Sequence, residues 1–317
     1  MEKEEKIWNF YQEMVRLLQK DPISGNKFVE QALTSIIFGY EFQDESLHSI
    51  ETLERLLLWN LSYNNKSQSN HNYPMVEEFV KPFSSINQDL YFNNLILKDP
   101  IQSRKTYMMC KLAEDMETKP NLSIAISLLQ KKNPEFIKSY EAISKLKEII
   151  RTGWITRNVE KAYQENDPSH IMQMFSLATA YFRLDETLDL DKEKVYEMIL
   201  IHEIGELIAG DIAEGSKEHS SKHEKEKEAV IKIFSPIKTG EHFIALWEEF
   251  EERKTKESQF VYQLDKIDPV LKAKVLDQDL KREDLFPDFF NYEEKRSTFA
   301  KGKVKELFYY IKEDENK

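Results

Sequence analysis

Apolar residues return every three or four positions along most of the chain, which is the period of an amphipathic α-helix. The first such segment, 6–20, has apolar side chains at Ile7, Phe10, Tyr11, Met14, Leu17 and Leu18. In the first half the pattern predicts further helices over 28–42, 50–61, 76–83, 90–97, 103–116, 122–130 and 134–150. In the second half it predicts helices over 168–184, 192–207, 223–234, 241–253, 257–276 and 290–311. No run of residues indicates a sheet, so we expect an all-α protein.

Breaking and capping residues predict where some of these helices begin and end. Asp21-Pro22 and Ser24-Gly25 are expected to stop the first helix. The segment LKEIIRTGW is expected to end a helix at Thr152-Gly153. Asp167 or Ser169 is expected to cap the helix over 168–184, because both residue types are common N-caps.

Composition agrees with a helical globular chain, since only 8 glycines and 10 prolines occur in 317 residues. The formal net charge of −12 argues against a duplex nucleic acid as partner, because phosphate contacts need clustered Lys and Arg. No apolar run approaches a membrane span, and the N-terminus MEKEEK lacks the apolar core of a signal peptide. With Cys110 as the single cysteine, we expect a cytoplasmic protein.

The stretch 199–215, ILIHEIGELIAGDIAEG, places ionisable side chains in an apolar helix. His202 and Glu206 are four residues apart and share a helical face, while Glu203 points about 100° away from His202. Three ionisable groups in so apolar a segment are costly to bury unless each has a partner. A metal ion is a common partner for an imidazole and carboxylates, so the stretch indicates a metal site.

Two further residues complete a candidate metal site: His170 in DPSHIMQMF and Asp265 in VYQLDKID. With His202 and Glu203 they make a mixed nitrogen and oxygen set, which suits Mn, Fe, Co, Ni or Zn, with Mg as a further candidate. Taken alone, a His on an apolar helix is more often a hydrogen-bonded core residue, and an Asp is more often a cap. The metal hypothesis therefore rests on the joint pattern.

The two halves of the chain resemble each other when Lys27 is laid over His170. In that register, with one further gap, the positions of His170, His202, Glu203 and Asp265 correspond to Lys27, Trp59, Asn60 and Ala113. We therefore expect two stacked helical units, residues 1–142 and 143–317, of which the first is a degenerate copy without metal ligands. The alternative is that any two helical segments of similar pattern overlay this well.

The order His…His-acid…Asp, with RTGW upstream and HEIGELIAGDIAEG in the middle, resembles the HD-domain metal-dependent phosphohydrolases. The most similar branch is the 5′-deoxynucleotidases, which hydrolyse deoxyribonucleoside 5′-monophosphates. The resemblance covers about residues 143 to 312, including the late segment LFPDFFNYEEKR. It implies a metal-dependent hydrolase acting on a nucleotide by a metal-activated water.

The resemblance also implies roles for single residues. It assigns the metal ion to His170, His202, Glu203 and Asp265, and the substrate phosphate to Arg151. It assigns acid/base work and positioning of the attacking water to Glu206 and Asp211. General chemistry agrees, because a divalent ion activates water and an arginine can form two parallel hydrogen bonds to phosphate oxygens. The alternatives are purely structural roles. Arg151 would be a charge at a helix C-terminus, and Asp211 would be a turn residue.

Lys222 and His223 are further candidates for binding the substrate phosphate. They follow a segment rich in Ser, Lys and Glu, so a solvated surface is the alternative for both, and His219 with His223 is not expected to bind metal. HEIGE also resembles the zinc-protease motif HExxH, but Glu206 stands at the position of a required His ligand.

Two residues depart from the family pattern: Glu203 stands where Asp is usual, and Ser169 where an acidic residue is usual. These departures keep open a non-catalytic binding or regulatory protein. Hydrolysis of another phosphoester or of a nucleoside triphosphate is a third reading. Members of the branch are dimers, so the degenerate first half is expected to replace the second subunit in a monomer, with a homodimer as the alternative.

Overall fold

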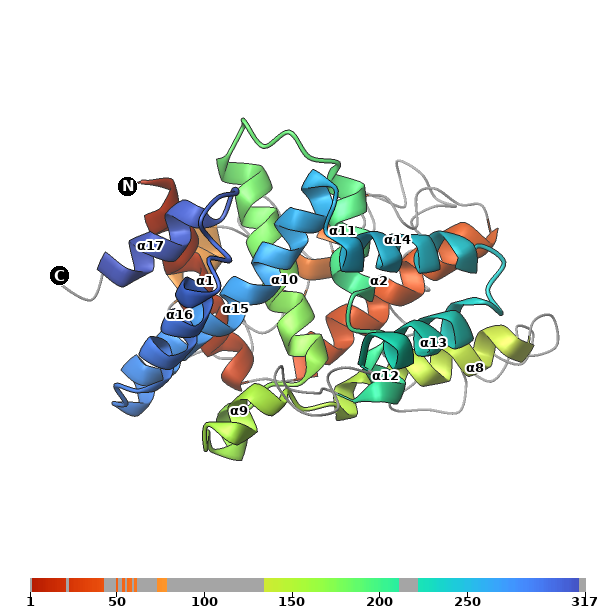
Figure 1. The fold of residues 1–317 in the computed structure, drawn as a ribbon, viewed down its shortest axis with the longest axis horizontal. Coiled ribbons are helices and arrows are strands. Elements are labelled where there is room, and N and C mark those ends of the chain that lie inside the picture. Colours follow the sequence, from red (N-terminus) through yellow and green to blue (C-terminus); the bar gives the residue numbers. More distant parts are fainter. Residues whose placement is uncertain are drawn as a thin grey trace.

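The computed structural model describes residues 2–20, 23–42, 50, 53, 54, 56–58, 60, 61, 73–78, 134–210 and 222–313 (Figure 1). Its helices are α1 (Lys3–Lys20), α2 (Ile23–Phe42), α8 (Pro134–Ile143), α9 (Thr152–Thr156), α10 (Asp167–Leu184), α11 (Lys192–Ile201), α12 (Glu206–Ala209), α13 (Lys222–Phe234), α14 (Gly240–Glu252), α15 (Lys256–Leu280), α16 (Leu285–Lys295) and α17 (Lys305–Glu313). Two 3₁₀ helices, η2 (Ser144–Glu148) and η3 (Lys161–Tyr163), lie between them.

The prediction of an all-α protein is confirmed, because the described residues contain no strand and only one isolated bridge, between Ile150 and Asn166. The predicted helices over 90–97, 103–116 and 122–130 lie outside the described residues. No helix in the described part of the chain has the length and apolar character that a membrane span needs.

Helix α10 runs through the centre of the described structure, where it contacts α1, α2, α11 and α15. All of its residues from Asp167 to Tyr181 are buried. A helix that is buried on all sides is stable only if neighbours surround it. Its N-cap is Asn166, whose side chain accepts a hydrogen bond from the backbone N–H of Ser169 at 3.1 Å. The predicted caps, Asp167 and Ser169, were wrong, since both lie inside the first turn.

Helix α11 ends at Ile201, so the predicted single helix over 192–207 was wrong. The backbone N–H groups of Ile204 and Glu206 bond the carbonyls of Ile201 and Glu203, three residues back, which tightens the chain into a turn before α12. His202 and Glu203 therefore lie in a turn between two helices, and Glu206 opens the second one.

The segment RTGW begins a helix, whereas the sequence predicted that a helix ends there. Arg151 has extended backbone angles and is the N-cap of α9. Its backbone N–H bonds the carbonyl of Glu165 at 3.0 Å, and the N–H of Asp167 bonds the carbonyl of Ile149 at 3.2 Å. This pairing ends the preceding helix early and holds Arg151 beside the start of α10.

Two further boundaries differ from the sequence prediction. The helix predicted over 290–311 is two helices, α16 and α17. Between them Ser297 and Gly302 have φ angles of 57° and 107°, which an α-helix cannot continue through. Ser24-Gly25, expected with Asp21-Pro22 to end the first helix, lies inside α2 instead, and Asp21-Pro22 lies outside the described residues.

Helices α1 and α2 pack directly on the helices of the second half (Figure 1). Phe28 of α2 meets Phe175 of α10 edge to face, with ring centroids 5.0 Å apart. Asn166 donates a hydrogen bond to the side-chain oxygen of Asn26 at 2.9 Å. The buried apolar residues of both halves form one continuous core.

The duplication of the two halves and their boundary stay predictions. Trp59 and Ala113, two of the four aligned positions, lie outside the described residues. Asn60 is described, and its side chain donates a hydrogen bond to Gln31 at 3.0 Å.

We predict that Gly25→Ala destabilises the protein through the crossing of α2 with α10. A Cβ at Gly25 would lie 2.9 Å from the backbone Cα of Ser169, so one of the two helices would have to move. The expected loss in the free energy of unfolding is about 1–3 kcal/mol, by the usual cost of overpacking. Chemical denaturation measures it.

Gly153→Ala in α9 is the matched control, because its Cβ would have no neighbour closer than 3.8 Å. The control should keep wild-type stability. Equal stability of Gly25→Ala and the wild type would show that α2 does not approach α10 as closely as described.

Candidate active site

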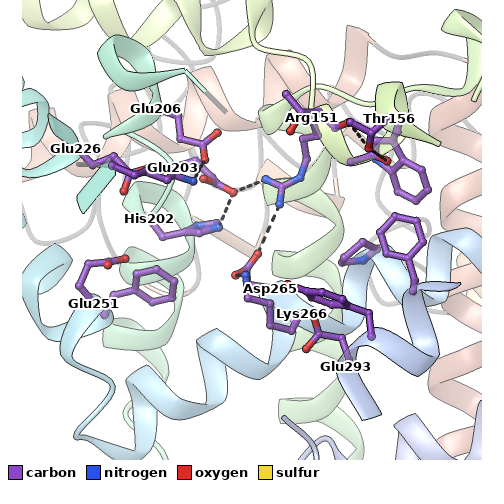
Figure 2. A pocket seen from close by; sticks show the side chains of 18 of the residues that line it. Arg151, Thr156, His202, Glu203, Glu206, Glu226, Glu251, Asp265, Lys266 and Glu293 are labelled. Carbon is purple, nitrogen blue, oxygen red and sulfur yellow. Dashed lines mark hydrogen bonds and ion pairs between the residues drawn. The ribbon is translucent and has the colours of Figure 1, made fainter. Parts of the chain in front are cut away.

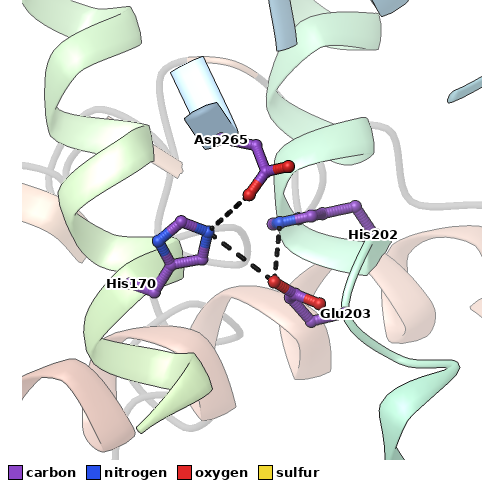
Figure 3. A group of neighbouring side chains, drawn as sticks. All are labelled: His170, His202, Glu203 and Asp265. Carbon is purple, nitrogen blue, oxygen red and sulfur yellow. Dashed lines mark ion pairs between the residues drawn. The ribbon is translucent and has the colours of Figure 1, made fainter. Parts of the chain in front are cut away.

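Four side chains from three distant parts of the chain meet at one buried point (Figure 3). They are His170 in the first turn of α10, His202 and Glu203 directly after α11, and Asp265 in α15. One ligand-type atom from each lies within 4.8 Å of the others. The structure therefore brings together the side chains that the sequence grouped as metal ligands.

The atoms that face the centre of this cluster are of the kinds a metal ion needs. Nε2 of His170 lies 3.2 Å from an oxygen of Asp265 and 3.6 Å from an oxygen of Glu203. Nε2 of His202 lies 3.4 Å from the same Glu203 oxygen. Both Nε2 atoms are buried and have no hydrogen-bond partner among the described residues. Buried nitrogens without partners, facing two carboxylates, fit a divalent cation.

The other nitrogen of each imidazole is held by a hydrogen bond. Nδ1 of His170 lies 2.7 Å from an oxygen of Asp268, and Nδ1 of His202 lies 2.8 Å from the carbonyl oxygen of Ile199. Such partners fix the tautomer and the ring orientation of a metal-binding histidine. Both rings therefore present Nε2 to the centre of the cluster.

The electrostatics of the cluster favour positive charge. Burial and the Arg151 guanidinium both lower the pKa of His170, but the carboxylates of Asp268 and Asp265 outweigh them and raise it to about 10. Burial alone would raise the pKa of Glu203, yet Arg151 and the two imidazoles hold it well below its usual range. A site that stabilises a proton between carboxylates in this way also stabilises a metal cation.

Arg151 reaches into the cluster from the start of α9 (Figure 2). Its guanidinium forms an ion pair with Glu203 and lies 3.7 Å from Asp265 and 3.8 Å from Asp167. The side chain is mostly buried, and it lines a pocket together with His202, Glu203 and Asp265. Its positive charge therefore lies against the carboxylates of Glu203 and Asp265.

A pocket of about 430 Å³ opens over the cluster. Its lining includes the predicted site residues Arg151, His202, Glu203, Glu206, Lys222, His223 and Asp265. Trp154, Phe250, Phe289 and Tyr292 add aromatic surface. Asp211 lies outside the described residues. The pocket has the size and the mixed lining of a small-molecule site.

Glu206 and Lys222 form a charged pair at one side of the pocket. The ammonium of Lys222 lies 3.0 Å from Glu206 and 3.3 Å from Glu226. Burial opposes its charge, but the neighbouring glutamates raise the pKa of Lys222 above its usual range. His223 lies at the rim, with Nδ1 3.1 Å from Glu251 and its ring stacked on Trp247.

Two residues of the site could not be recognised from the sequence. Burial raises the pKa of Glu226 to about 7, although Lys222 lowers it, so this carboxyl can exchange a proton near neutral pH. Its only signal was its spacing of four from Lys222, in a helix whose many charges resemble a solvated surface. Asp268, the partner of His170, stands three residues after Asp265 and so lies on the same side of α15.

A sequence profile of the HD domain family matches residues 143–307, more than half of the chain. The chain belongs to the HD domain family. All four residues of the cluster lie inside the matched region of this HD domain protein, whereas α1 and α2 lie outside it.

Several curated proteins are similar to part of the chain. The 5′-deoxynucleotidase HDDC2 of Xenopus laevis is 33% identical over 168 residues, which are 52% of this chain and 78% of that protein. The protein of the same name from Mus musculus is 34% identical over 41% of this chain and 64% of its own length. The 5′-deoxynucleotidase hdd1 of Schizosaccharomyces pombe is 28% identical over 44% of this chain and 71% of its own length.

Two solved structures are also similar to part of the chain. A predicted metal-dependent phosphohydrolase from Magnetospirillum magnetotacticum has a TM-score of 0.43 and 24% identity, and the match covers 56% of this chain and 88% of that one. A conserved hypothetical protein from Pyrococcus furiosus has a TM-score of 0.46 and 24% identity, covering 56% of this chain and 97% of that one.

We predict that His202→Ala loses the bound metal ion. The substitution removes one of the two buried imidazoles and leaves the cation with too few ligands. Elemental analysis of the purified full-length chain measures the metal content.

His223→Ala is the control, since His223 lines the same pocket but contacts Glu251 at its rim. It should keep wild-type metal content. Equal metal content in wild type and His202→Ala would exclude His202 as a ligand.

Proposed function

We propose that the protein is a metal-dependent phosphohydrolase that removes phosphate from nucleoside 5′-monophosphates, deoxyribonucleotides above all. The observation that carries this proposal is the pair of buried imidazole nitrogens of His170 and His202, which face Glu203 and Asp265. His202, Glu203 and Asp265 also line the pocket. Relatives that carry the name 5′-deoxynucleotidase support the choice of substrate.

His170, His202, Glu203 and Asp265 would hold one divalent cation, for which Mn, Co, Fe, Ni, Zn and Mg are candidates. Such a cation supplies two things when bound, a lowered pKa for a water molecule and polarisation of a phosphoryl oxygen. Glu203 is longer than the aspartate that the family usually has. Its carboxylate nevertheless lies within reach of both imidazoles.

Arg151 binds the phosphate of the substrate in this proposal. Its guanidinium has five N–H donors in a planar fork, so it can keep Glu203 and still bond phosphate oxygens. An anionic substrate needs such a group here, because the pocket floor is acidic. Lys222 also lines the pocket and adds a second positive charge there, 3.0 Å from Glu206.

Glu206 takes the proton of the attacking water in this proposal. Its side chain is buried, lines the pocket and holds one oxygen against the ammonium of Lys222. A positioned carboxylate of this kind can accept a proton at one oxygen and later deliver it to the leaving group. Asp211 is proposed to assist in positioning the water, as the family resemblance implies.

We further propose that residues 1–142 stand in for a second subunit. Gly25 of α2 faces Ser169 of α10. In the alignment that lays Lys27 over His170, Gly25 corresponds to Pro168 and Ser169 corresponds to Asn26. Each helix thus meets its counterpart at nearly the equivalent position, which is the pattern of an isologous contact.

We therefore predict that the full-length chain sediments as a 37.6 kDa monomer, because the surface that a partner would use is already covered. Analytical ultracentrifugation over a range of concentrations measures this. A dimer that persists on dilution and joins two C-terminal halves would contradict the proposal.

We predict that Glu206→Gln lowers phosphate release by about 10²–10⁴-fold, the usual contribution of a general base. The amide keeps the shape but cannot take the proton, and the metal content should not change. The assay follows phosphate release from a panel of nucleoside and deoxynucleoside 5′-monophosphates with added Mn or Co.

Glu251→Gln is the matched control, because Glu251 lines the same pocket but pairs with His223 at the rim. It should keep near wild-type rates. A folded, metal-loaded wild type that releases phosphate from none of these nucleotides would refute the enzyme and favour a binding or regulatory protein.

A further inference from the structure

Tyr11, in the middle of α1, reaches the hydrogen-bond partner of His170. Its hydroxyl oxygen lies 2.6 Å from Oδ1 of Asp268, while Oδ2 of the same carboxylate lies 2.7 Å from Nδ1 of His170. All three side chains are fully buried. A chain of two short hydrogen bonds therefore joins the first helix of the protein to the candidate metal site.

Three acceptor oxygens surround the Tyr11 hydroxyl, and Oδ1 of Asp268 is the nearest of them. The side-chain N–H of Gln173 donates to Glu165 at 2.9 Å, so the Gln173 oxygen faces Tyr11, at 3.0 Å. The backbone carbonyl of Asp268 also lies 3.0 Å from the hydroxyl. A phenol has a single proton, and the shortest contact, to Oδ1 of Asp268, is the best placed to receive it.

We infer that Tyr11 is a positioning residue for His170, so that α1 is part of the metal centre although it lies outside the segment that matches the HD domain family. The hydroxyl fixes the orientation of the Asp268 carboxylate. The carboxylate in turn fixes the imidazole, with Nε2 directed at the cation. This inference rests on the metal site proposed above.

The physical reason is that Asp268 is buried and has a separate partner for each oxygen. Without the hydroxyl, Oδ1 would lack its donor in a place that water does not reach, and the carboxylate would turn toward another donor. Such a turn weakens its hydrogen bond to Nδ1 of His170. Loss of a partner behind a metal ligand typically lowers metal affinity about 10–100-fold.

The test is Tyr11→Phe in the full-length chain, stripped of metal with a chelator and titrated with Mn²⁺ alone by calorimetry. We expect Mn²⁺ to bind about 10-fold more weakly than to wild type, by the usual effect of such partners. The visible absorption of the Co²⁺-loaded protein should also change, because it reports the arrangement of the ligands.

Tyr196→Phe is the matched control. Its hydroxyl also bonds a carboxylate and another hydroxyl, Glu54 at 2.8 Å and Thr179 at 3.1 Å, but it touches no residue of the metal site. Both variants lose one largely buried phenol oxygen, so a purely structural role predicts the same small fall in thermal midpoint for each. Only Tyr11→Phe should lose Mn²⁺ affinity.

Asp268→Asn supplies a second variant, because Tyr11 is inferred to act through Asp268. We expect weakened Mn²⁺ binding in Asp268→Asn and little further loss when Tyr11→Phe is added. Wild-type affinity in a folded Tyr11→Phe, or in a folded Asp268→Asn, would overturn the inference alone. Failure of the wild type to bind Mn²⁺ or Co²⁺ would instead overturn the metal site, and the inference with it.

Discussion

The burial of two imidazoles and two carboxylates at one point is the constraint on which the rest of the site depends. Charged and polar groups are costly to remove from water unless each has a partner. Here one helix start, one helix end and one helix interior supply the four groups, and Nε2 of both histidines has no hydrogen-bond partner among the described residues. A cation is the partner that satisfies all four side chains at once.

Groups around the cluster keep it in order. Asp268 and the Ile199 carbonyl hold the two imidazoles, and Arg151 offsets the negative charge of Glu203. Several of these supports come from segments far away in the chain. The site is therefore a property of the packed helices, and α1, which lies outside the segment that carries the family pattern, reaches it through the hydrogen bonds of Tyr11 and Asp268.

Most long helices were predictable because their apolar stripes report which face is buried. Other predictions failed where a contact between distant segments overrides local preference, or where nothing in the local sequence marks the end of a helix. RTGW begins a helix because the chain before it pairs with residues 165–167. Helix α11 stops at Ile201, although no glycine or proline marks that position. The periodic pattern of α16 and α17 did not show the break between them, because residues on both sides of it face the same core.

The sequence by itself determined the all-α class and the set of side chains suited to a metal site, because helical period and residue chemistry are local properties. Only the tertiary structure decided that His170, His202, Glu203 and Asp265 face one another, and that Glu226 lines the pocket with the last three of them. The same is true of Tyr11 and Asp268. Their pairing joins residues 257 positions apart, and no local pattern encodes which distant side chain a buried hydroxyl will meet.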